Sequence, residues 1–545
     1  MKDMLIQHLP ILPIALPLMF GAMLLLFSES RHFARNTLSI VSCVAQLLVA
    51  VSLLVMASGG FPDVWPTGMA VYLMGDWQAP FGIVLVVDRL AAVMLTLSSV
   101  LGLAALIYSL AKWDRAGVHY LPLFQFLLMG LNGAFLTGDL FNLFVFFEVM
   151  LAASYGLMLH GSGTPRVRAG LRYIAVNLLA SFLLLIGIAM IYGVTGTLNM
   201  ADIAVRAGAL DGSARVLFEA GAAVLSVAFV IKAGAWPLNF WLTDAYSNAA
   251  PPVAAIFSMM TKVGLYAVVR LGSLLLPTGA PAAFGLEWMF VIGLATLGFG
   301  TIGLLSAQKL EKLVAYSVIV SSGTLLTALG MPGVTLTGPA LFYLVSSVLA
   351  SGAFFMLAEM IERTRSFGAN VLAVTFDAFD LEDPTTANRS DDVVGVAIPA
   401  AMAFLGLAFV SCVLLITGLP PLSGFVAKFA LLSAAVASAA GPTPAIDAWL
   451  LVGGLLISGL AGVIALSRSG IRVFWASEER TTPRLRVAEA GPVSVLILIC
   501  VAMAFWAEPV IAYLDSAAVS LDRPATYIDA VMSAASTRTP EGALP

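Results

Sequence analysis

Charged residues are scarce in this 545-residue chain, where Asp, Glu, Lys and Arg together make up 11% of the sequence. Hydrophobic residues make up 60%, and the mean hydropathy is +0.99. These values lie far outside the range of water-soluble domains and are typical of polytopic membrane proteins. The composition therefore excludes a sizeable soluble domain, and the net charge of −4 says little because the charges gather in loops.

Cysteine and histidine are also scarce, and neither is arranged for ligation. The cysteines lie in separate apolar runs without C-x-x-C spacing and the histidines lie near segment ends: Cys43, Cys412, Cys500, His8, His32, His119 and His160. Iron–sulfur and zinc sites are therefore excluded by ligand count. A G-x-G-x-x-G pattern at Gly298, Gly300 and Gly303 lies inside an apolar run, so we interpret it as close helix packing. We expect no cofactor, no metal and no redox centre.

Apolar runs long enough to cross about 30 Å of hydrocarbon are the dominant feature of the chain. About fourteen of them predict an all-α polytopic membrane protein, and the N-terminal run is expected to be a retained first span. Basic residues fall mainly on alternate loops, which favours a cytoplasmic position for those loops and an outer position for both termini. These loops contain Arg31, Arg35, Lys112, Arg115, Arg166, Arg168, Arg172, Lys309, Lys312, Arg363, Arg365, Arg468 and Arg472.

Two polar stretches interrupt this pattern. The acidic loop over residues 364–392, with FDAFDLEDPTTANRSDD, exceeds the usual connection length and is expected to be a cytoplasmic element or a partner contact. The tail over residues 508–545 is rich in Ala, Ser and Thr, and we expect it to be partly disordered.

Two lysines lie in the middle of adjacent apolar runs, Lys232 in the first and Lys262 in the second. A lysine at the centre of a membrane helix costs roughly 2.5–3.5 kcal/mol and usually marks an ion route. Gly234 and Pro237 predict a break in the first of these helices, and broken helices at membrane depth tend to line ion sites. The alternative interpretation is that each lysine extends to the membrane surface and the proline only bends the helix.

Glu148 is the acidic counterpart in span 5, with apolar residues on both sides. A buried carboxylate needs a cation, and Lys232 is the cheapest partner; a low-dielectric site would also favour the neutral forms of both groups. The alternative is a neutral glutamic acid that hydrogen-bonds a neighbouring helix. Asp139, at the end of the same span, is interpreted as a helix cap or interfacial group.

A second broken element carries the third lysine. Pro420, Pro421 and Gly424 prevent a continuous helix, and Lys428 follows them in an apolar half-helix, although it too is able to extend to the surface. Two interrupted helices in different halves of a chain indicate inverted structural repeats. Near the outer ends, Arg270 is placed at the interface, and Asp88 with Arg89 is interpreted as a local ion pair of structural importance.

The runs TGDLFNLFVFFEVMLAASY, KAGAWPLNFWLTDAYSNAAPPVAAIFSMMTKVGLYAVVR and GLPPLSGFVAKFALL, together with GDWQAPFGIVLVVDRLAAVML at residues 75–95, carry a resemblance. They resemble the antiporter-type subunits shared by respiratory complex I and the multisubunit Mrp (Mnh, Pha) cation/proton antiporters, the D subunit above all. The resemblance reaches to about residue 510.

This resemblance implies two inverted five-helix repeats, spans 4–8 and 9–13, each with a broken helix. The division is then residues 1–118 for helices 1–3, 119–278 and 279–472 for the repeats, and 473–545 for the last helix and tail. It also implies that Glu148 pairs with Lys232, that Lys262 is the central relay, and that Lys428 ends the second half-channel.

Spans 10 and 11 depart from the family. Span 11 reads YLVSSVLASGAFFML where many relatives carry a histidine and a lysine, and Ser321 stands where relatives often have histidine. The second half-channel is therefore expected to depend on hydroxyl groups and water.

The resemblance implies a function in ion transport. We expect a proton-translocating subunit of a multisubunit Na⁺ or K⁺/proton antiporter in a bacterial inner membrane, a transporter rather than an enzyme. Its partners would be the other subunits and the lipid bilayer, with no nucleic acid. The alternatives are a membrane-arm subunit of a complex I-like NADH dehydrogenase or membrane-bound hydrogenase, and a scaffold that only packs partner subunits.

Overall fold

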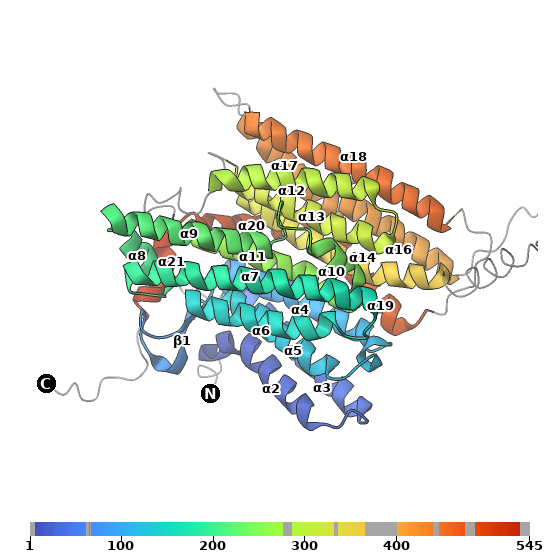
Figure 1. Ribbon diagram of the computed structural model, residues 1–545, viewed down its shortest axis with the longest axis horizontal. Helices are drawn as coiled ribbons and strands as arrows, with labels where there is room; N and C mark the ends of the chain where they lie inside the picture. Colours follow the sequence, from blue (N-terminus) through green and yellow to red (C-terminus); the bar gives the residue numbers. More distant parts are fainter. Residues whose placement is uncertain are drawn as a thin grey trace, which may run out of the picture.

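The computed structural model describes residues 6–60, 65, 67–275, 286–331, 336–365, 400–439, 446–474 and 485–534. Long, roughly parallel helices form one bundle in these residues (Figure 1). The described part of the chain adds to them a single two-stranded sheet. The predicted all-α membrane fold is confirmed, while the acidic segment over 366–399 lies outside the described residues.

Fourteen helices correspond to the predicted spans. Thirteen helices of the described chain are long and apolar enough to cross a membrane, and the 17-residue α5 is slightly shorter. The spans are α2 (Leu12–Leu26), α3 (His32–Val55), α4 (Arg89–Ser109), α5 (Tyr120–Leu136), α6 (Leu140–Met158), α7 (Thr164–Thr195), α9 (Gly212–Lys232), α11 (Pro251–Leu275), α12 (Leu286–Ser306), α13 (Leu310–Leu329), α14 (Thr337–Arg365), α16 (Ala400–Thr417), α18 (Ile446–Phe474) and α19 (Val487–Phe505).

Shorter elements connect or extend these helices. They are the strands β1 (Ala70–Leu73) and β2 (Val84–Val87), the helices α8 (Met200–Ala207), α10 (Leu242–Asn248), α17 (Ser423–Ala439), α20 (Ala507–Leu521) and α21 (Pro524–Met532), and the short turns η1 (Leu9–Ile11), η2 (Met56–Gly60), η3 (Met74–Asp76) and η4 (Trp113–Arg115).

The helices α11, α13 and α14 form the centre of the bundle. In their most apolar windows 94%, 83% and 89% of the residues are buried, against 28% for the first span. The helices α2 and α3 lie on one flank, and α16, α17 and α18 lie on the opposite flank (Figure 1). Residues of α11 therefore have protein on all sides, which is where a polar group can be kept out of lipid.

Both predicted helix breaks are present. The helix α9 ends at Lys232, Gly234 follows with a φ of +70°, and the next helix, α10, starts only at Leu242. In the same way α16 ends at Thr417, Gly418 has a φ of +77°, and α17 starts after the two prolines. Glycine tolerates these left-handed values and proline cannot continue the helical hydrogen bonds, so the local sequence accounts for each break.

The small sheet and three short helices gather at one end of the bundle (Figure 1). The strands pair antiparallel with Ala70 opposite Val87, and α20 packs on α4 and α14 while α21 packs on α8. The polar tail, expected to be partly disordered, is helical over Ala507–Leu521 and Pro524–Met532. The helix α20 buries Leu514, Ala517, Ala518 and Leu521 in a helical stripe against the bundle.

A buried ion pair joins two helices at this end. The Asp88 Oδ2 atom lies 2.7 Å from Arg270 Nη2, and the two side chains are 4% and 6% exposed. The predicted local pair of Asp88 with Arg89 is therefore wrong, because Asp88 caps α4 by accepting from Ala91 N (2.8 Å) and turns its other oxygen toward α11. Arg270 is buried inside the protein and lies over the ring of Tyr266; its expected depth near the outer interface stays a prediction.

The opposite end carries the basic loops. His160 follows α6 and donates from Nε2 to the Trp113 carbonyl at 2.8 Å, and Arg166 donates to the His160 carbonyl at 2.7 Å. Arg166 also donates to the Asn248 carbonyl at 2.7 Å, which ties this loop to α10. Burial lowers the pKa of His160, since a buried imidazolium loses hydration.

Candidate proton pathway

Lys232 occupies the last residue of α9, at the start of the first break. Its side chain is buried, with 5% exposed, and Nζ donates to Ser181 Oγ of α7 at 3.3 Å. The amine also lies 4.8 Å from the centre of the Phe147 ring of α6. Three helices thus hold this amine inside the bundle, so the alternative of a lysine that reaches the membrane surface does not apply.

Glu148, on α6, lies near Lys232 of α9, but the two side chains do not form an ion pair. No contact within 4 Å joins the two charged groups in the described part of the chain, although they interact electrostatically. The Glu148 Oε1 atom is buried without a hydrogen-bond partner. A buried carboxylate oxygen of this kind needs a proton or a water molecule. Glu148 and Lys232 are therefore electrostatic neighbours without a direct ion pair.

A small cavity adjoins the amine of Lys232. It has a volume of about 10 Å³ and is lined by Phe147, Asn177, Lys232, Trp241, Tyr246 and Met260, among others. A space of about 10–15 Å³ holds one water molecule when polar groups are present. The amine and the Asn177 amide supply such groups, so a water molecule fits between α9 and the centre of the bundle.

Lys262 lies in the middle of α11 and is 1% exposed. Its Nζ donates to Ser321 Oγ at 3.1 Å and to Ser322 Oγ at 3.2 Å, both on α13. Ser321 in turn donates to Ser347 Oγ of α14 at 2.9 Å. The central amine is therefore held by hydroxyl groups, and a line of hydrogen bonds leads from it across two helices.

Close backbone contact sets the position of α11 against α9. A Cβ atom at Gly264 would lie 2.7 Å from the carbonyl oxygen of Phe229 and 3.0 Å from the nitrogen of Ala233, so only glycine fits there. This contact lies two residues from Lys262 and beside the residue that follows Lys232 in the chain. The approach of the two backbones thus brings the two lysine-bearing segments together.

Lys428 lies on α17, past the second break, and is 7% exposed. Its Nζ donates to the carbonyl oxygen of Thr417 at 2.9 Å, at the end of α16. The last carbonyls of a helix have no partner within the helix and carry partial negative charge, which suits an amine. Nearby, Ser423 at the start of α17 shares a 2.8 Å hydrogen bond with Ser346 of α14.

Hydroxyl groups in the second half of the chain form two separate hydrogen-bonded groups. Lys262, Ser321 and Ser347 form one hydrogen-bonded line, and Ser346 with Ser423 forms a second contact on the next residue of α14. No hydrogen bond between described residues joins these two groups or leads on to Lys428. Asp139 is a helix cap, as predicted, and accepts from Asn142 N at 2.8 Å.

Ser181 and Ser347 contact the route and were not predicted from the sequence. The available signal was weak, because serine is common in membrane helices and its hydroxyl is readily satisfied by its own helix. In the described residues, no group of three His, Cys, Asp or Glu side chains is arranged to hold a metal ion. The chemistry that this arrangement supports is proton exchange between amines, hydroxyl groups and water.

Comparison with known proteins decides the family. The family described as "NADH:quinone oxidoreductase/Mrp antiporter, TM" matches residues 137–447, which is more than half of the chain and includes all four predicted ionisable residues. The chain belongs to this family.

Relatives in this family place the chain beside the D subunits of Mrp-type antiporters. It is 51% identical to a protein of Rhizobium meliloti (strain 1021) named as the D subunit of a probable K(+)/H(+) antiporter, over 97% of this chain and 98% of that protein. It is 32% identical to the D subunit of the Na(+)/H(+) antiporter of Alkalihalophilus pseudofirmus, over 96% and 99%. A chain in "Structure of Mrp complex from Dietzia sp. DQ12-45-1b" superposes with a TM-score of 0.79 at 26% identity, over 97% of this chain and 100% of that chain.

Proposed function

We propose that this chain is the proton-translocating D subunit of a multisubunit monovalent cation/proton antiporter. The observation that carries this proposal is the set of three lysines, Lys232, Lys262 and Lys428, which are 5%, 1% and 7% exposed. Their amines donate only to hydroxyl or carbonyl oxygens among the described residues. Because no ion pair has to be broken, each amine can release and regain a proton at a modest cost.

The proposed route begins at the separated pair of Glu148 and Lys232. A proton moves between them through water, because Glu148 Oε1 has no protein partner and a cavity for one water molecule adjoins the amine. Movement of the two side chains toward or away from each other changes the attraction between their charges and so gates the transfer. From there the proton passes by water to Lys262, two residues from the close contact at Gly264.

The second half of the route is proposed to use hydroxyl groups in place of ionisable ones. Ser321 and Ser347 continue from Lys262, and Ser346 with Ser423 leads toward the half-helix of Lys428. Water molecules complete the steps between these groups. A hydroxyl group donates one hydrogen bond while it accepts another, so such a line passes a proton without holding a charge.

The same proposal includes the placement in the membrane. The basic loops lie in the cytoplasm of a bacterium and both termini lie on the outer face of its inner membrane. The segments 119–278 and 279–472 are two inverted repeats, and the broken helices α9–α10 and α16–α17 are equivalent elements of them. The partners are the other subunits of the antiporter, in agreement with relatives that are named as subunits.

Transport in everted vesicles tests the proposal. The complete complex, carrying this chain as wild type, Lys232→Ala or Lys262→Ala, is assayed for cation-driven proton movement with Na⁺ and with K⁺. Both variants are expected to abolish antiport while the complex still assembles, and the surface variant Lys309→Ala is expected to retain it. Full antiport by Lys232→Ala would remove that residue from the mechanism, and full antiport by both Lys232→Ala and Lys262→Ala would favour a scaffold.

A membrane-arm subunit of an oxidoreductase is the alternative function. The two relatives described above are named antiporter subunits, which weighs against it. In the same vesicles, proton movement driven by a cation gradient alone supports the antiporter. Proton movement that requires an electron donor would favour the oxidoreductase.

A further inference from the structure

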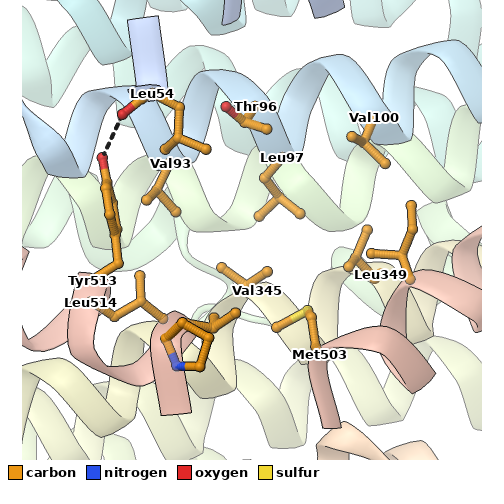
Figure 2. A pocket seen from close by; sticks show the side chains of 13 residues that line it. Leu54, Val93, Thr96, Leu97, Val100, Val345, Leu349, Met503, Tyr513 and Leu514 are labelled. Atoms are coloured by element: carbon orange, nitrogen blue, oxygen red, sulfur yellow. Dashed lines mark hydrogen bonds between the residues drawn. The ribbon is translucent and has the colours of Figure 1, made fainter. Parts of the chain in front are cut away.

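An apolar slot lies apart from the lysines, between α4, α14, α19 and α20. Its volume is about 310 Å³, roughly ten times the volume that one water molecule takes up in the liquid. Figure 2 shows its walls converging on a common space: Val93, Leu97, Val100, Val345, Leu349 and Met503. An apolar space of this size stays free of water and accepts an apolar occupant.

The slot is long and offers nothing to a polar ligand. Val93 and Val100 lie seven residues apart on α4, which corresponds to a length of about 10 Å along the helix. The Thr96 hydroxyl donates to the Ala92 carbonyl at 2.8 Å, and Tyr513 donates to the Leu54 carbonyl at 3.4 Å (Figure 2). Both polar groups in the wall are therefore satisfied within the protein, and the shape suits a linear hydrocarbon chain.

One end of the slot carries a positive charge without a counter-ion. Arg89 begins α4, one turn before Val93, and its side chain is partly exposed. It donates to the carbonyl oxygens of Ala57 at 3.1 Å and Ser516 at 3.4 Å, and it makes no ion pair within 4 Å among the described residues. Backbone carbonyls fix the guanidinium group but leave its charge uncompensated. The neighbouring Arg270 differs, because Asp88 neutralises it.

The surface beside the slot suits lipid. Phe505 and Trp506, at the junction of α19 and α20, are 83% and 66% exposed, and Val51 and Val55 of α3 are 42% and 47% exposed. Val55 lies two residues before Ala57, whose carbonyl binds Arg89, so exposed apolar surface adjoins the charged end of the slot. Phe505 and Trp506 follow Met503, which lies toward the other end (Figure 2). A lipid with its headgroup at Arg89 would extend its acyl chain along the slot in that direction.

We propose that this slot binds one acyl chain of an anionic phospholipid, whose phosphate group contacts Arg89. Guanidinium binds phosphate oxygens with charge-assisted, often paired hydrogen bonds, and basic sites between membrane helices bind anionic headgroups. The lipid then fastens α20 to α4 and α14. This site is independent of the proton pathway and of the proposed transport function.

Lipid content of the purified complex tests the site. The complete complex is purified in mild detergent from cells whose anionic lipid is phosphatidylglycerol, and bound lipids are counted by native mass spectrometry. One phosphatidylglycerol per chain is expected for the wild type, and Leu97→Trp, which fills the slot, and Arg89→Gln are expected to lose it. Arg89→Lys, which keeps the charge, and Ile302→Trp, at a 70% exposed position on α12, are expected to retain it. Unchanged lipid content in both Leu97→Trp and Arg89→Gln would overturn the proposal.

A second measurement covers variants that fold poorly. Delipidated wild-type complex is mixed with phosphatidylglycerol or phosphatidylcholine, and the midpoint of thermal unfolding is recorded. A rise with phosphatidylglycerol alone is expected, and the milder variant Val345→Met is expected to show less than half of that rise. Equal rises with both lipids would overturn the role of Arg89. Loss of a co-purifying subunit from Val345→Met, with lipid binding unchanged, would show that a protein segment occupies the slot instead.

Discussion

The buried pair of Asp88 and Arg270 allows a prediction with a magnitude. In Asp88→Asn the amide still caps α4 at Ala91, because Asn caps helices as well as Asp, but the negative charge is lost. Arg270 is then left as an uncompensated buried charge, which costs about 3–5 kcal/mol. The rings of Tyr266 and Tyr527, at 5.5 and 5.1 Å, contact the guanidinium group in the wild type and in the variant, so they do not change this difference, and we expect a loss of about 3–5 kcal/mol.

Denaturant titration of the purified chain in mixed micelles gives the free energy of unfolding for this test. Arg270→Met in the Asp88→Asn background is expected to recover about 2–3 kcal/mol, since replacing both partners of a buried pair is often close to neutral. Asp202→Asn is the matched control. Its partner Arg206 is 47% exposed, and such a pair is worth about 0–1 kcal/mol.

Two results would refute this reasoning. If Asp88→Asn is as stable as the wild type, the pair does not bear the charge that its 2.7 Å separation indicates. If the double variant is no more stable than Asp88→Asn alone, the loss does not come from an uncompensated arginine.

Three further predictions concern packing, proton transfer and pH. Gly264→Val is expected to lower the free energy of unfolding by about 1–3 kcal/mol, because the valine side chain would meet the backbone of α9. Gly453→Ala is a near-neutral control in the same titration, since a Cβ atom at Gly453 would have no neighbour within 4 Å among the described residues. Ser321→Ala removes one of the two hydroxyl groups that accept hydrogen bonds from Lys262. Because a hydrogen bond to a charged group contributes about 1.5–3 kcal/mol, antiport in everted vesicles is expected to slow by about tenfold. An unchanged rate would contradict the proposed route through hydroxyl groups. Because the pKa of His160 is lowered in the folded chain, the unfolded chain binds more protons below about pH 6.5, and stability falls as the pH falls. The midpoint of thermal unfolding is therefore expected to drop less between pH 7.5 and 5.5 in His160→Asn than in the wild type. An equal drop in both proteins would show that His160 does not cause the pH dependence.

The breaks and the buried lysines could be predicted because both depend on local chemistry. Gly234 and the prolines at 420 and 421 act on their own segments whatever surrounds them. Lys232 is conspicuous in any apolar run, since a charge there has to be accommodated inside the protein. Local rules of this kind also predict the number of spans.

Contacts between distant segments could not be predicted in the same way. Arg270 pairs with Asp88 because of how α11 rotates against α4, and sequence spacing does not give that rotation. The hydrogen bond from Lys232 to Ser181 depends on the packing of α9 against α7 in the same way. These outcomes depend on the packing of whole helices.

The helices in the described part of the tail could not be predicted for a different reason. Its content of Ala, Ser and Thr indicates disorder, but Leu514, Ala517, Ala518 and Leu521 follow the spacing of a helix with one buried face. That pattern is present in the sequence. Small residues carry it weakly, because alanine adds little to a count of hydrophobic positions.

The hydrogen bond from the Lys428 amine to the Thr417 carbonyl connects an ionisable side chain of α17 to the end of α16, across the second helix break. The end of a helix carries roughly half a negative charge, so an ammonium group draws the two half-helices together more strongly than a neutral amine does. Loading and unloading of one hydrogen ion would then tighten and relax α16 against α17. Under the proposed function, protonation of this lysine would thereby be coupled to bending of the second broken helix.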